Sequence, residues 1–214
     1  LAGAALALGQ AQKALETLDA HGVSSDSWLL LLRGKALQQL NRDAQAAADF
    51  QAVLYGFPLS SEARTAEAIL TTLRAKLGAQ YPQVPLEQQL ARADVLFDRN
   101  RCGEARPEYA AALPRLGAGA VRDRVELRIA RCRIRAGAPV TVLTTLKLQT
   151  PAVDAERLYA LSQTYRARRQ QAAMLDAVEK LAAAYPDSPW TEQAFFDTGN
   201  SYWVELERAK AYVE

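Results

Sequence analysis

The sequence predicts an all-α fold, a right-handed superhelix (an α-solenoid) of about six helical hairpins. Alanine is abundant while valine and isoleucine are few, so helix-favouring residues outnumber strand-favouring ones. Half of the 214 residues are hydrophobic and the formal net charge is only +2, which excludes a mainly disordered chain. Small residues also recur at a regular spacing, with larger apolar residues at fixed distances after them. Such recurrence is typical of stacked hairpins that each contact only their neighbours.

The clearest hairpin is predicted at residues 25–57. Gly34 and Ala46 are small, and Phe50 follows four residues after Ala46. Because two antiparallel helices approach closely only where side chains are small, we expect Gly34 to face Ala46, with Phe50 filling the groove beside them. A polar turn separates the two helices, and Pro58 ends the second one.

The same spacing returns along the chain. The small anchors stand at positions 2, 34, 93, 130, 162 and 199, which gives gaps of 32, 59, 37, 32 and 37 residues. The long gap holds an additional helix predicted at 61–77. Ala93, Ala105, Tyr109 and Gly199 are expected to pack at the repeat positions. We predict a single domain over 1–214, with hairpins near residues 1–21, 25–57, 87–116, 120–149, 155–185 and 189–214.

This spacing resembles that of tetratricopeptide-repeat (TPR) α-solenoids, whose period is about 34 residues. The resemblance covers nearly the whole sequence and is most distinct at 28–58 and 155–203. The alternative is an irregular helical bundle.

A narrower resemblance involves the junction at residues 184–194, the aromatic segment 195–203, and the segment 92–105. These segments are similar to the superhelical domain of bacterial soluble lytic transglycosylases, which cleave peptidoglycan with a separate lysozyme-like domain. The resemblance implies a non-catalytic superhelical part of such an enzyme in the periplasm of the bacterial cell envelope. It also implies a lysozyme-like segment after Glu214. The alternative is a free-standing TPR adaptor that mediates protein–protein interactions in the cell envelope.

The sequence offers no catalytic constellation, metal site or cofactor site, so the chain by itself is not expected to be an enzyme. One histidine and two cysteines exclude the usual zinc sites. Glu104 and Glu108 are most simply charges on a helix surface, and His21 is most simply a helix end. No apolar run is long enough to span a membrane, and the positive charge is too small to indicate a nucleic-acid partner.

The main candidate binding surface is a stripe of arginines. Successive members are four, three and four residues apart, so they share one helix face: Arg124, Arg128, Arg131 and Arg135. Guanidinium groups hold carboxylates or phosphates through paired hydrogen bonds, which suggests an anionic partner such as an acidic peptide or a glycan carboxylate. The alternative is ion pairing with neighbouring helices, through Glu104, Glu108, Glu126 or Glu156.

Two further features leave alternatives open. Cys102 and Cys132 are expected near the same edge of a solenoid, so they form either a disulfide or two buried thiols. A local cluster near the C-terminus forms either an interface for residues outside the chain or a platform for sugar stacking: Trp190, Phe195, Phe196, Tyr202 and Trp203. The concave face of the superhelix is the expected surface for a protein, peptide or peptidoglycan partner.

Overall fold

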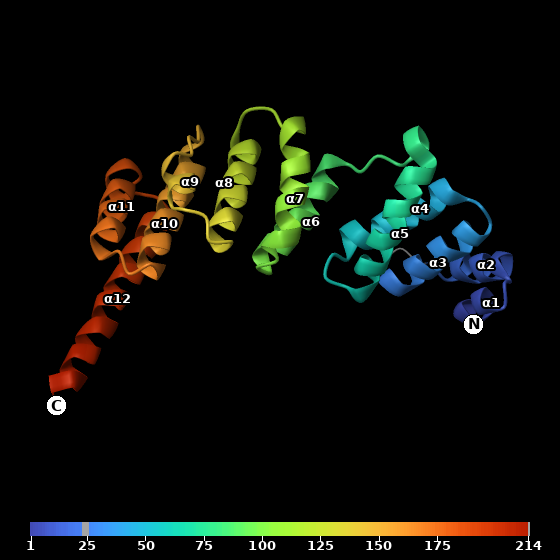
Figure 1. The fold of residues 1–214 in the computed structure, drawn as a ribbon, viewed down its shortest axis with the longest axis horizontal. Helices are drawn as coiled ribbons and strands as arrows, with labels where there is room; N and C mark the ends of the chain where they lie inside the picture. The colour runs from blue at the N-terminus through green and yellow to red at the C-terminus, as the bar shows by residue number, and fades with distance from the viewer. Residues whose placement is uncertain (23–25, 214) are drawn as a thin grey trace. The chain divides into compact units, whose positions relative to one another are not determined.

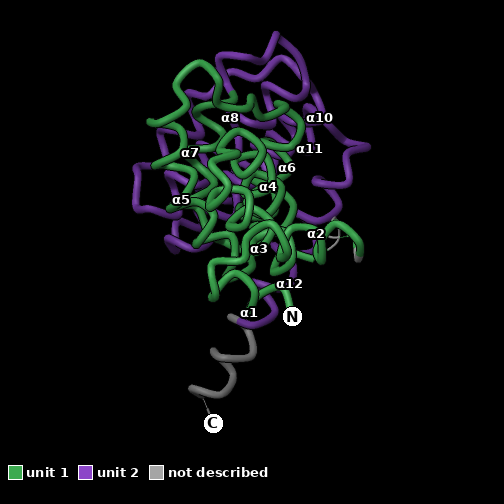
Figure 2. Tube along the Cα trace, turned by 90° about the vertical axis from the view of Figure 1, so that its right-hand side faces the viewer, with its two compact units in different colours: residues 1–112 green, residues 113–214 purple. Residues whose placement is uncertain are grey.

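The protein is all-α. The computed structural model describes residues 1–22 and 26–213, with the side chains of His21 and of residues 205–213 outside the description (Figure 1). Over these residues the chain forms twelve α-helices and two short 3₁₀ helices, and no strand. It divides into two compact units, Leu1–Ala112 and Leu113–Glu214 (Figure 2).

The first unit consists of seven α-helices. Neighbours in sequence pack on one another, α1 on α2, α2 on α3, α3 on α4, α4 on α5 and α6 on α7, and α4 also contacts α6. Their bounds are α1 Ala2–Ala7, α2 Ala11–His21, α3 Ser27–Gln39, α4 Asp43–Gly56, α5 Ser61–Leu77, α6 Leu86–Asp98 and α7 Cys102–Ala112. Thus α5 occupies the range predicted for the additional helix.

The pairing of α3 with α4 has a tight contact at its centre. Asp26 caps α3 by accepting hydrogen bonds from the backbone N–H groups of Trp28 and Leu29, at 2.8 and 3.1 Å. A Cβ atom added to Gly34 would lie 2.6 Å from Cε1 of the fully buried Phe50 ring, so only glycine fits without displacing the ring. Trp28, in the first turn of α3, is half exposed.

The second unit contains the remaining helices. In it α10 packs on α8, α11 and α12, and α11 packs on α12. The bounds are α8 Ala120–Arg135, α9 Thr141–Thr144, α10 Pro151–Ala167, α11 Gln171–Ala184 and α12 Pro189–Val213. The hairpin predicted near 120–149 therefore has only a four-residue second helix.

One predicted hairpin is wrong. Residues 189–213 form the single 25-residue helix α12 in place of two paired helices. The physical reason is that residues 201–213 contain no glycine, proline or asparagine that could end the helix, so helix-favouring residues carry it through Gly199.

The same backbone turn closes five pairs of consecutive helices. One residue in each has a positive φ, namely Gly9, Asn41, Asn100, Gly137 and Arg169, with φ between 58° and 89°. In each turn the next residue donates its N–H to the carbonyl four residues before the positive-φ position, at 2.8–3.0 Å. The turns are 32, 59, 37 and 32 residues apart, which matches the spacing of the small anchors.

Candidate functional site

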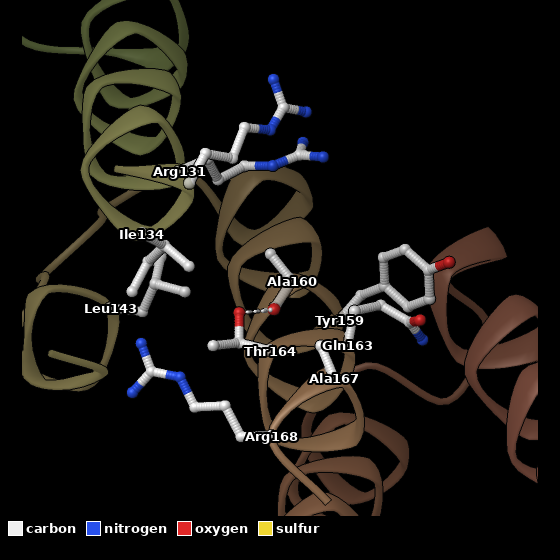
Figure 3. Close-up of a pocket in the computed structure, with 10 residues that line it drawn as sticks. Arg131, Ile134, Leu143, Tyr159, Ala160, Gln163, Thr164, Ala167 and Arg168 are labelled. Carbon is white, nitrogen blue, oxygen red and sulfur yellow. Dashed lines mark hydrogen bonds between the residues drawn. The ribbon is translucent and has the colours of Figure 1, made fainter. Parts of the chain in front are cut away.

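A cavity lies in the second unit, between α8, α9 and α10. It is an open-sided pocket of about 370 Å³. Figure 3 shows Arg131 at one end and Arg168 at the other, with Ile134, Ala160 and Thr164 between them. The full lining is Arg131, Ile134, Arg135, Leu143, Tyr159, Ala160, Gln163, Thr164, Ala167 and Arg168. The lining thus combines three guanidinium groups with an apolar floor, and none of these described residues is acidic.

Arg131 enters the pocket from α8 and is held by α10. Its Nη1 atom lies 2.6 Å from Oε1 of Glu156, and both side chains are largely covered. This is one of the ion pairs that the alternative interpretation of the arginine stripe predicts. It fixes the guanidinium at the rim of the pocket.

Arg168 stands at the opposite end of the pocket and caps the C-terminus of α10. Its Nη2 atom donates to the carbonyl oxygen of Ala138, at 2.7 Å. This bond ties the end of α10 to the turn that follows α8. Arg135, an exposed residue in the last turn of α8, adds a third positive charge.

The wall contributed by α10 is held by contacts with α12. The ring of Tyr159 stacks on that of Trp190, with centroids 5.1 Å apart. Asp197 of α12 accepts hydrogen bonds from Tyr159 Oη at 2.8 Å and from Gln163 Nε2 at 3.0 Å. Burial, together with this hydrogen bond to a carboxylate, raises the pKa of Tyr159 to about 12. The phenol therefore stays protonated and remains a donor to Asp197 at ordinary pH.

Asp123 fixes the start of α10 against α8. Its buried Oδ2 atom accepts the backbone N–H groups of Gln149 and Thr150, at 3.0 and 2.7 Å. Burial by itself would raise the pKa of this carboxyl, but the hydrogen bonds from Thr150 and Gln149 and the charge of Arg122 outweigh it, so the pKa lies below its ordinary value. The two helices that form the pocket are thus locked in register by a charged acceptor.

The structure divides the predicted arginine stripe. Arg131 and Arg135 line the pocket, whereas Arg124 and Arg128 do not. Arg124 is exposed and Arg128 is half-buried. Only the C-terminal half of the stripe therefore contributes to this pocket.

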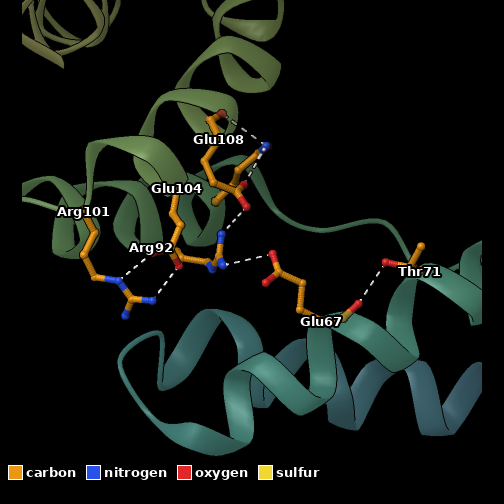
Figure 4. A network of polar contacts seen from close by, with 7 residues as sticks. Glu67, Thr71, Arg92, Arg101, Glu104 and Glu108 are labelled. Atoms are coloured by element: carbon orange, nitrogen blue, oxygen red, sulfur yellow. Dashed lines mark hydrogen bonds and ion pairs between the residues drawn. The ribbon is translucent and has the colours of Figure 1, made fainter. Parts of the chain in front are cut away.

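The other predicted acids are also paired, in a network within the first unit (Figure 4). Glu104 accepts from its neighbour Arg101, at 2.6 and 2.7 Å. Glu108 of α7 pairs with Arg92 of α6, which is only 3% exposed and which also reaches Glu67 of α5 at 3.4 Å. A buried guanidinium that binds two carboxylates from two other helices fixes their packing, and loss of either acid would leave a poorly solvated charge.

The residues predicted to pack between helices differ in their burial. Ala46, Phe50, Ala93, Ala105 and Tyr109 are all fully buried. Pro58 is half-buried just beyond the end of α4. Gly199, in contrast, is exposed, and nothing lies within 4 Å of a Cβ atom added to it. The expectation that Gly199 packs within the chain is therefore wrong, since α12 continues where a second helix was expected.

Neither Cys102 nor Cys132 is a free thiol in the structure. Each of these cysteines is disulfide-bonded. The described residues hold no group of three or more His, Cys, Asp or Glu side chains placed to bind a metal ion. In the same part of the chain no helix has both the length and the apolar character of a membrane span.

Sequence reasoning predicted only two of the ten residues that line the pocket, Arg131 and Arg135. Tyr159, Gln163 and Arg168 were not among the predicted site residues, although Tyr159 and Gln163 are one turn apart on α10. Two polar side chains at i and i+4 on a helix with buried neighbours could have signalled a lined cavity. No model of a known protein family and no curated protein matches this chain.

Proposed function

We propose that this chain is a non-catalytic helical-repeat interaction module that binds a carboxylate-bearing partner in the pocket between α8 and α10. One observation carries the proposal: Arg131, Arg135 and Arg168 surround a pocket of about 370 Å³ that no acidic residue among the described ones lines. A carboxylate placed there would meet guanidinium groups in partly desolvated surroundings, where charge-assisted hydrogen bonds are strongest.

The apolar floor favours a peptide-like group over a free ion. Ile134, Leu143 and Ala160 supply apolar surface between the arginines, and Gln163 adds an amide. A short peptide with a side-chain or terminal carboxylate would use both kinds of contact.

We propose that the bound carboxylate belongs to peptidoglycan, whose peptide stems carry such groups. The proposal follows from the similarity of residues 92–105 and 184–203 to the superhelical domain of lytic transglycosylases. In this role the chain is a TPR-like solenoid in the periplasm that helps to hold the substrate while a separate catalytic domain cleaves the glycan. The second candidate is an envelope adaptor that binds an acidic protein segment in the same pocket.

The test measures co-sedimentation of the chain with purified peptidoglycan and, in parallel, its binding to a soluble acidic peptide. We expect saturable peptidoglycan binding without cleavage, weakened about tenfold in the double variant Arg135→Gln/Arg168→Gln. The control is Arg124→Gln, which removes one positive charge from α8 outside the pocket.

Three results would change this assignment. Binding of the acidic peptide without binding of peptidoglycan would favour the adaptor. Equal loss in Arg124→Gln and in the double variant would indicate general charge attraction, and turnover of glycan by the chain alone would refute a non-catalytic role.

A further inference from the structure

The second surface of interest is the uncovered face of α12. One side of this helix is buried, since Thr191 and Ala194 are 3% and 1% exposed where α12 packs on α10 and α11. Around the helix from these residues lie Phe195, Phe196 and Tyr202, which are 56%, 64% and 41% exposed. Large aromatic side chains gathered on one side of a helix are a frequent mark of an interaction surface.

The residues of this face have the same spacing as residues that are buried under a neighbouring helix in α3 and α10. Relative to Gly199, the aromatic residues Phe195 and Tyr202 stand at −4 and +3. In α3, the residues at −4 and +3 from Gly34 are Leu30 and Leu37, which are 3% and 5% exposed.

The same comparison holds for α10, where the small residue is Ser162. Ser162 is 1% exposed, and Leu158, at −4, is 8% exposed. In both cases the helix that covers this face is the next one in the chain, α4 on α3 and α11 on α10.

Gly199 is the second observation. A glycine inside a helix costs about 1 kcal/mol relative to alanine, a cost that is justified where another side chain needs the space. Gly34 has such a reason, because the ring of Phe50 fills the space of its missing Cβ. At Gly199 the same space is empty, so nothing among the described residues requires a glycine there.

The covering helices share a simple chemistry. Sixteen residues after each small anchor they carry a bulky buried side chain, Phe50, Tyr109 or Val178. The residue four positions before each bulky side chain is smaller or unbranched: Ala46, Ala105 or Met174.

We propose that α12 docks an amphipathic helix of another polypeptide, antiparallel to α12, with a bulky apolar side chain seated on Gly199. The phenyl rings of Phe195 and Phe196 and the phenol of Tyr202 flank that side chain, as Leu30 and Leu37 flank Phe50. The helix must come from outside the described residues, since α4, α7 and α11, which carry the required pattern, already pack on α3, α6 and α10. This site is separate from the arginine-lined pocket and does not depend on the function proposed for it.

The test uses a labelled synthetic peptide with the sequence of residues 170–185, which forms α11 in the structure. We choose it because α10 and α12 share tyrosine at +3, Tyr165 and Tyr202, so α11 is the covering helix best matched to α12. Fluorescence anisotropy should show saturable binding to the intact chain. The peptide with Val178→Asp should bind at least about tenfold more weakly, because a charge would be placed on Gly199.

The decisive variant is Gly199→Leu in the intact chain. Leucine favours the helix, so thermal unfolding should be unaffected or improved, while peptide binding should fall about tenfold or more because the seat is filled. The matched control is Asn200→Leu, which adds the same side chain one residue around the exposed helix and should leave binding unchanged.

Three results would overturn the proposal. The peptide fails to bind at concentrations up to about millimolar, or it binds the Gly199→Leu chain as well as the original. The third is self-association of the chain that Gly199→Leu abolishes, because a second copy would then occupy the face. The Arg135→Gln/Arg168→Gln variant should bind this peptide normally, so failure here is distinguishable from failure of the pocket.

Discussion

Replacing Gly34 with alanine tests the close contact between α3 and α4. The new Cβ would lie 2.6 Å from Cε1 and 2.9 Å from Cδ1 and Cζ of Phe50, where carbon atoms prefer separations of about 3.5–4.0 Å. The Phe50 ring is fully buried, so it has no open space into which it could swing. Overpacking of this kind costs about 1–3 kcal/mol, and the gain in helix propensity returns about 1 kcal/mol. The expected net loss is therefore up to about 2 kcal/mol.

Gly199→Ala provides the matched comparison. It receives the same gain in helix propensity, but its Cβ meets nothing within 4 Å. The free energies of unfolding of the two variants should therefore differ by about 1–3 kcal/mol, the overpacking cost alone. In thermal unfolding followed by circular dichroism, each kcal/mol corresponds to about 2–4 °C in a chain of this size.

A third variant identifies the atom responsible. If Phe50 causes the loss, Phe50→Leu should cost less in the Gly34→Ala background than in the original chain, because the smaller side chain relieves the clash. Equal stability of Gly34→Ala and Gly199→Ala would refute the close approach of α3 and α4.

Four further changes have distinct expected outcomes. Ala46→Trp should strongly destabilise the chain, because Ala46 is fully buried, and an unchanged melting temperature would contradict the α3–α4 packing. Asp123→Asn should lower the free energy of unfolding by about 1–3 kcal/mol at neutral pH. Because the folded-state pKa of Asp123 is depressed, its contribution is present above the unfolded value and lost as pH falls through the folded one. Urea titrations of the original chain and of Asp123→Asn should therefore converge in acid. Arg169→Gly should stabilise by about 1 kcal/mol, because Arg169 has φ 58° in a region that favours glycine, and thermal unfolding would measure the gain. In protein purified without reductant, a thiol reagent should label neither Cys102 nor Cys132 until reductant is added, and labelling beforehand would contradict the disulfide.

The local features of the fold could be predicted from the sequence. Alanine-rich helices, polar turns and the spacing of small anchors all depend on residues within a few positions of one another, so composition and periodicity contain them. The turns at Gly9, Asn41 and Gly137 follow from residue types that tolerate a positive φ. Arg169 has a positive φ as well, although its residue type does not favour it, so residue type alone does not predict this turn.

The candidate site depended on contacts between residues distant in sequence. Arg131 could equally have faced solvent, and its pairing with Glu156, 25 residues later, required α8 and α10 to be placed first. The cap that Asp123 provides for Thr150 spans a similar distance. A periodic pattern does not predict such contacts, because charged and polar side chains can make them from many positions on a helix.

Gly34 and Gly199 separate what the sequence determines from what depends on tertiary structure. Gly34 and Gly199 occupy the same place in the sequence pattern, each flanked by large apolar residues at −4 and +3. The sequence alone determined that both stand at an anchor of a helix. Only the tertiary structure decided that Phe50 fills the space at Gly34 while the space at Gly199 stays open. The physical reason is that the space left by a missing Cβ atom matters only if another side chain fills it, and that side chain comes from another helix.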